Sequence, residues 1–168
     1  MEEQNFEDFA KRWPDLFQKS GDFEFSIGPG WYGIIDTLCG LMSQRVEQAK
    51  ARLKYAMENP DRKLFKSIPE LEQEVADALE ELPEIAQVKE KFGTLRFYIN
   101  GGTVETHNYI AFAEAMTAHV CEVCGSPGKS RHGNWVRVLC NQHHMEQCPE
   151  EYPDEPSTTK LQPGLAED

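Results

Sequence analysis

Four residues in the C-terminal third of the chain have the types and the spacing of a metal site. A Cys-x-x-Cys pair is followed, fifteen residues later, by a Cys-x-x-His pair, and together they supply Cys121, Cys124, Cys140 and His143. Zn²⁺ in structural sites is held tetrahedrally by four thiolate or imidazole ligands, and two such pairs at this separation are typical of zinc ribbons. We therefore predict one structural zinc ion coordinated by these four side chains.

The identity of the fourth ligand stays open, because His143 and His144 are adjacent and spacing does not separate them. Weaker candidates that lie close in the sequence are His119, His132 and Cys148. Gly125, directly after the first pair, can adopt a positive φ and let the chain turn back toward the sulfur atoms. Four protein ligands leave no coordination position for water, so we expect the metal to hold the fold together and not to catalyse a reaction.

The segments around the metal pairs predict the elements that position them. Residues 104–119 have helical periodicity and lead directly into Cys121. The apolar stripe expected on this helix consists of Tyr109, Phe112, Ala113, Met116 and Val120. Between the two pairs, residues 126–128 are typical of a turn, and residues 135–139 form an apolar, β-branched run that predicts a strand.

The rest of the chain predicts an α+β core with two long helices and a small antiparallel sheet, to which a zinc-ribbon-like C-terminal knuckle is added. Helical spacing covers residues 4–13, 31–58 and 67–82, and strand-like alternation covers residues 22–27, 85–90 and 94–99. Ser67 and Glu70 have the spacing of a capping box at the start of the third helix.

The domain organisation follows from these patterns. We expect residues 1–120 to form the core and residues 121–148 to form a knuckle packed on it. The composition of residues 149–168, with several prolines, many acids and few apolar residues, predicts a disordered acidic tail.

The formal net charge of −12 is unevenly distributed, with ten acidic and four basic residues between positions 58 and 90. Long-range repulsion from phosphate backbones counts against non-specific nucleic-acid binding, whereas the same charge permits an acidic surface that docks on a basic protein partner. The best candidate surface is an acidic helix face containing Glu70, Glu74, Asp77 and Glu81. Such a face is also typical of an ordinary solvated helix.

Two other functions remain as alternatives. The chain around the metal pairs is locally basic, and a nucleic-acid-binding zinc ribbon would use Lys129, Arg131, Trp135 and Arg137 as contacts. A small metal-dependent nucleotide hydrolase would use the histidines near the metal pairs. The sequence has none of the motifs H-E-x-x-H, G-x-S-x-G or Walker A, so we expect a protein that is not an enzyme.

Composition also bears on the cellular compartment. No run of eighteen apolar residues predicts a transmembrane helix, and the acidic N-terminal segment lacks the apolar region of a signal peptide. Five cysteines, of which three stand in a metal pattern, are typical of a reducing cytoplasm.

A family resemblance rests on one further motif. The segment Val88-Lys89-Glu90-Lys91-Phe92-Gly93-Thr94-Leu95-Arg96-Phe97-Tyr98 is followed by a helix and then by the two metal pairs, and Gly30-Trp31 opens the long helix. This succession, over residues 28–145, resembles a group of uncharacterised bacteriophage and prophage proteins. The resemblance implies a phage origin and a zinc site. From such an origin we expect an accessory protein that binds a host or phage protein in host takeover or counter-defence.

Overall fold

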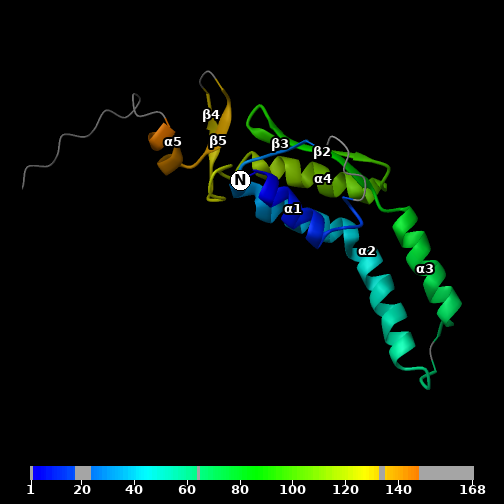
Figure 1. The fold of residues 1–168 in the computed structure, drawn as a ribbon. Helices are drawn as coiled ribbons and strands as arrows, with labels where there is room; N and C mark the ends of the chain where they lie inside the picture. The colour runs from blue at the N-terminus through cyan, green and yellow to red at the C-terminus, as the bar shows by residue number, and fades with distance from the viewer. Residues whose placement is uncertain (1, 18–23, 64, 133–134, 148–168) are drawn as a thin grey trace, which may run out of the picture.

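The computed structural model describes residues 2–17, 24–63, 65–132 and 135–147, with side chains from Phe6 onward. In chain order the elements are α1 (Glu2–Arg12), β1 (Glu24–Ser26), the 3₁₀ turn η1 (Pro29–Trp31), α2 (Tyr32–Glu58), α3 (Ile68–Glu80), β2 (Glu84–Lys91), β3 (Thr94–Asn100), α4 (Val104–Thr117), β4 (Lys129–Arg131), β5 (Arg137–Leu139) and α5 (Asn141–Gln147). Figure 1 shows a central body with a helical arm at one end and β4, β5 and α5 at the other. The predicted α+β class is confirmed.

The central sheet has three strands in the order β1-β2-β3. β2 and β3 form the expected antiparallel hairpin, whereas β1 pairs with β2 in parallel. The sheet is therefore mixed, which differs from the antiparallel sheet expected from the sequence. The reason is the long connection: the chain leaves β1, runs through α2 and α3 and returns to β2, and a crossover of this kind permits parallel pairing.

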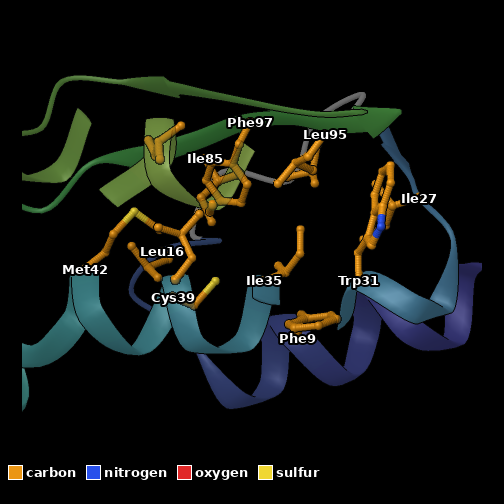
Figure 2. Packing of buried hydrophobic residues seen from close by; sticks show 14 of the residues in the cluster. Phe9, Leu16, Ile27, Trp31, Ile35, Cys39, Met42, Ile85, Leu95 and Phe97 are labelled. Carbon is orange, nitrogen blue, oxygen red and sulfur yellow. The ribbon is translucent and has the colours of Figure 1, made fainter. Parts of the chain in front are cut away.

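The hydrophobic core lies between α2 and the sheet (Figure 2). Side chains from the N-terminal half of α2 recur every three or four residues and therefore form one stripe that faces β2 and β3. The side chains in this cluster with no exposed surface include Trp31, Ile35, Val88 and Leu95. Phe9 of α1 also belongs to it.

α4 turns a different face to the body than the sequence suggests. Its buried stripe consists of Thr106, Ile110, Ala113 and Thr117, whereas Phe112 and Met116 of the predicted stripe are 68% and 40% exposed. The cause is the free edge of β3. The hydroxyl of Thr117 accepts a hydrogen bond from the Leu95 N–H at 3.0 Å, and the carboxylate of Glu114 accepts one from the Phe97 N–H at 2.9 Å. Satisfying these backbone donors orients α4 with its polar side chains toward the strand.

The C-terminal half of α2 and all of α3 form a helical hairpin that projects from the body (Figure 1). We call residues 44–63 and 65–82 the arm. A small apolar cluster of Val46, Ala49 and Ala78 joins its two helices. The predicted capping box is present at the start of α3, where the Ser67 N–H donates to a Glu70 carboxylate oxygen at 2.7 Å. Among the described residues, no helix combines the length and apolar character needed to cross a bilayer.

Two expectations lie outside the described residues. The predicted strand over residues 22–27 is seen only in part, as β1, and the predicted disordered tail over residues 149–168 is not described.

Candidate metal centre

The four predicted ligands converge on one point in the structure. The potential ligand atoms of Cys121, Cys124, Cys140 and His143 all lie within 4.8 Å of one another. The Nδ1 atom of His143 is 3.6 Å from the Cys121 sulfur and 3.2 Å from the Cys140 sulfur, and the sulfur atoms of Cys124 and Cys140 are 3.9 Å apart. Neighbouring sulfur atoms in a tetrahedral site with bonds of about 2.3 Å lie roughly 3.8 Å apart. The group could therefore hold a metal ion with little rearrangement.

The first two ligands come from a tight turn directly after α4. The Gly125 N–H donates to the Cys121 carbonyl at 2.9 Å, and the Cys121 N–H donates to the Ser126 carbonyl at 2.8 Å. Gly125 has a φ of 77°, as its place after the Cys-x-x-Cys pair predicts. The turn brings both sulfur atoms to one side of the backbone.

The other two ligands lie at the start of α5. Cys140 directly precedes this helix, and His143 lies in its first turn. The structure places His143 in the ligand group, while His144 is buried at 6% exposure outside it. Among the described residues, His119 and His132 also lie outside the group, and Cys148 is not described.

The metal centre packs against Gly28, Gly30 and Trp31 in the N-terminal half of the chain, and we call these three residues the seat. A Cβ atom placed on Gly30 would lie 2.1 Å from the Cys121 carbonyl oxygen, and one on Gly28 would lie 2.1 Å from the Glu122 carbonyl oxygen. The Gly30 N–H donates to that Glu122 carbonyl at 2.8 Å. The indole N–H of the fully buried Trp31 donates to the Val120 carbonyl at 2.9 Å. Only residues without a side chain permit this approach of the two backbones.

Glu122, between the first two ligands, supplies a second link. Its side chain is only 8% exposed and forms an ion pair with Arg137 of β5. Burial raises the pKa of Glu122 and the Arg137 guanidinium opposes that rise, so the ion pair favours the charged carboxylate. The other carboxylate oxygen of Glu122 is buried and has no hydrogen-bond partner among the described residues. The turn is thus tied to β5 as well as to the body.

The cysteines differ in their readiness to become thiolates. Hydrogen bonds from the hydroxyl and backbone N–H of Ser126 lower the pKa of Cys124 to about 6, and Cys124 is exposed. Burial raises the pKa of the Cys39 thiol, in the core, to about 12, with a further contribution from Asp36. Metals bind thiolates, so Cys124 is prepared for a ligand role, whereas Cys39 serves as a small apolar core residue.

The predicted acidic surface lies on one side of the arm, and each of its four members already has an intramolecular partner. Glu70 completes the capping box, and Asp77 accepts a hydrogen bond from Gln73. Glu74 pairs with Lys66 at 2.7 Å and with Arg52 at 3.8 Å, and Glu81 pairs with Arg45. The cations of α2 therefore offset part of the charge of α3.

The predicted nucleic-acid contacts separate into two groups. Arg137 is held by Glu122 and by Gln147, and Arg131 donates to the side chain of Asn141 at 2.7 Å. Lys129 and Trp135 are exposed, and the Trp135 side chain is 68% accessible. Two of the four residues thus stabilise the knuckle, and two are presented to solvent.

Sequence reasoning missed the residues that join the metal centre to the body. In the sequence, Gly28-Pro29-Gly30 indicates only a break between a strand and the long helix. Glu122 reads as an ordinary acid within a Cys-x-x-Cys pair, although it is buried and paired with Arg137. The sequence signal that could have found the seat is the pair of glycines next to a tryptophan, a place where a close backbone approach is possible.

A scan of the chain against protein-family models, curated proteins and solved structures finds no match.

Proposed function

We propose that Cys121, Cys124, Cys140 and His143 hold one Zn²⁺ ion as a structural centre. Three thiolates and one imidazole form a soft, nitrogen- and sulfur-only donor set, which suits zinc. The supporting observation is that the four ligand atoms lie within 4.8 Å of one another. Four protein ligands complete the coordination, so the metal performs no reaction. It stabilises the contact between the seat and the turn that carries Cys121 and Cys124.

The function that this geometry supports best is non-enzymatic protein binding, with the arm as the docking element. The observation that carries it is an open groove of 460 Å³ on the arm, bordered by Arg52, Lys66 and Glu74 and walled by apolar side chains. The apolar residues that line it are Ala51, Tyr55, Phe65 and Leu71. Phe65 is fully exposed and Tyr55 is 40% exposed, so the groove offers aromatic surface that the described residues do not cover.

The charge of α3 defines the partner that fits this groove. The helix carries five acidic and no basic residues. Its Glu72 and Glu80 are exposed beside the acidic surface of Glu70, Glu74, Asp77 and Glu81. A partner segment with an apolar face and flanking lysine or arginine side chains would fill the groove and meet this charge. Basic residues of the partner would then compete with Arg45 and Lys66 for the same carboxylates.

The resemblance to bacteriophage and prophage proteins supports a host-directed role. A phage accessory protein acts in the bacterial cytoplasm, where its partners are host or phage proteins. We therefore propose that this chain inhibits or redirects one such protein, in host takeover or in counter-defence. This step rests on analogy of origin and not on the site.

Affinity purification from bacterial lysate tests the proposal when it compares matched variants. The wild-type chain should capture a protein that cross-links to the arm and is released by salt. A Tyr55→Ser, Phe65→Ser double variant should lose that protein, and Glu72→Lys, Glu80→Lys should weaken its capture. Phe112→Ser is the control, because Phe112 is also an exposed aromatic residue but lies on α4. If the groove variant captures the same protein as the wild type, the arm is not the docking element.

Metal analysis tests the zinc centre separately. The purified chain should contain one equivalent of zinc, and Cys124→Ala should contain none. Turnover of a nucleotide by the zinc-loaded chain would instead favour a metal-dependent hydrolase and contradict the non-enzymatic proposal.

A further inference from the structure

The turn between β2 and β3 holds Phe92 in a backbone conformation that is unfavourable for a bulky residue. Phe92 and Gly93 have φ values of 56° and 79°, the pattern of a two-residue hairpin turn in which both central residues are left-handed. Asn, Asp and Gly are preferred at the first position, because a bulky side chain at positive φ is strained. Phe92 is the one non-glycine residue with positive φ in the described part of the chain, and its side chain is 70% exposed. No burial in the protein offsets this strain.

A second exposed aromatic residue lies beside this turn. A Cβ atom placed on Gly93 would be 3.3 Å from both the Cγ1 atom and the carbonyl oxygen of Val136, so the turn packs against the start of β5. Trp135, the neighbour of Val136, is 68% exposed. Two aromatic side chains that are 43 positions apart in the sequence are thus presented along one edge of the molecule.

One carboxylate holds both parts of this edge. Glu90 accepts a hydrogen bond from the Gly93 N–H with one oxygen and from the Trp135 indole N–H, at 3.3 Å, with the other. Both carboxylate oxygens of Glu90 therefore accept hydrogen bonds from neutral donors within the protein. The arrangement fixes the turn relative to the indole and so limits the entropy lost when a ligand orders the two rings.

The sequence around this edge is less acidic than the rest of the chain, although Glu90 contacts Trp135 and Glu122 pairs with Arg137. Residues 123–145 contain Lys129, Arg131 and Arg137 and no acidic residue. The ammonium of Lys91 lies 5.4 Å from the centre of the Phe92 ring, and Lys129 is exposed on β4. Aromatic faces with nearby lysines are the features by which proteins bind single-stranded nucleic acid: bases stack on the rings and phosphates meet the cations.

We propose that the edge formed by Phe92 and Trp135, which we call the aromatic edge, binds single-stranded DNA or RNA by base stacking. This activity goes beyond the proposed protein binding and uses the end of the molecule opposite the arm (Figure 1). A duplex keeps the faces of its bases stacked on one another, so it offers no surface for the two rings. Affinity is modest, because the net charge of −12 repels phosphates at long range.

Fluorescence anisotropy of labelled oligothymidylate and oligouridylate with the zinc-loaded, full-length chain tests the proposal. Binding is expected at low salt, with a log–log salt slope of about −1.4 for two phosphate contacts. Phe92→Ala and Trp135→Ala should each weaken binding at least about fivefold, the lower end of the effect of one stacked base. Phe112→Ala, which removes an equally exposed ring from α4, should leave binding unchanged. A duplex of equal length should not compete.

Phe92→Asn separates binding from folding. Asn suits the left-handed first position of this turn, so the variant should unfold at a higher temperature than the wild type while it loses affinity for the oligonucleotide. The proposal is overturned if the folded, zinc-loaded chain binds neither single-stranded probe at low salt. Unchanged affinity in both Phe92→Asn and Trp135→Ala would also overturn it. Neither result would affect the arm, whose partner is tested with other variants.

Discussion

Gly30 is a residue at which the N-terminal half of the chain closely approaches the metal centre. A Cβ atom at this position would lie 2.1 Å from the Cys121 carbonyl oxygen and 2.5 Å from the Gly125 N atom. Both obstacles are backbone atoms of the turn that carries the first two ligands. The turn cannot give way by a side-chain rotation, so any larger residue at position 30 must separate the seat from the metal centre.

Gly30→Ala should therefore destabilise the chain by about 1–3 kcal/mol, the usual range for overpacking, and weaken metal binding. Gly33→Ala is the matched control. A Cβ atom at Gly33 meets nothing within 4 Å, and alanine in α2 should stabilise the helix by about 0.5–1 kcal/mol. Denaturant unfolding and competition with a metal chelator measure the two effects. Equal stability of the two variants would contradict the seat as described.

α4 and β3 are joined by hydrogen bonds from backbone to side chain as well as by apolar packing. Thr117 has no exposed surface, and its hydroxyl accepts from the Leu95 N–H and donates to the Glu114 carbonyl. Thr117→Val keeps the shape of the side chain and leaves a buried backbone N–H without its acceptor. The expected cost is about 1–3 kcal/mol, with faster hydrogen exchange at Leu95.

Thr37→Val serves as the control for this change. The Thr37 hydroxyl donates to the Gly33 carbonyl within α2 at an exposed position, so water can replace that bond. Its stability should change by no more than about 0.5 kcal/mol. If Thr117→Val is equally mild, α4 is held in its orientation by apolar contacts alone.

The capping box at the start of α3 predicts a pH dependence. Hydrogen bonds from the Ser67 N–H and hydroxyl hold the pKa of Glu70 below its usual range. A carboxyl whose pKa is lower in the folded state stabilises the fold above its unfolded pKa, and this contribution is lost as the pH falls through the folded pKa. Glu70→Gln should therefore lower the unfolding temperature at neutral pH, and the difference should vanish in acid.

Glu72→Gln is the control for the capping box, because Glu72 is exposed on the same helix and makes no hydrogen bond within the described residues. Its unfolding temperature relative to the wild type should change less between neutral and acidic pH. A constant difference for Glu70→Gln across that range would mean that its charge does not stabilise the start of α3.

The elements were predicted well where local rules decide them. The two metal pairs, the β2–β3 hairpin and the capping box all follow from spacing within a few residues, and each is present. The prediction that Phe112 and Met116 are buried was wrong. The orientation of α4 depends on unpaired backbone N–H groups at the edge of β3, which are a property of the assembled sheet. The parallel pairing of β1 likewise depends on the path of the whole chain.

At the scale of the molecule, the metal centre and the core share one set of contacts. Trp31 has no exposed surface, lies in the hydrophobic core and donates its indole N–H to the Val120 carbonyl, directly before the first ligand. Gly30 donates to Glu122, between the first two ligands. The sequence suggests a core over residues 1–120 with a knuckle added to it, and its only signal of a bond between the two is the pair of glycines next to Trp31.

Metal removal should therefore destabilise the core as well as the knuckle. Structural metal binding is coupled to folding, so a chelator that strips the ion releases the turn around Cys121 and Cys124. Release of the turn breaks the bonds from Gly30 and Trp31, whose donors would then need other partners in a buried site. We expect chelation to lower the unfolding temperature of the whole chain and to shift the indole N–H resonance of Trp31.

The indole N–H resonance of Trp13 provides the internal reference. This N–H donates to the Asp36 carboxylate, away from the metal centre. Its resonance should shift only when the chain unfolds, whereas that of Trp31 should shift as soon as the ion leaves. Addition of zinc should reverse both the shift and the loss of stability. If chelation changes neither the Trp31 resonance nor the unfolding temperature, the metal stabilises the knuckle alone and residues 1–120 fold independently of it.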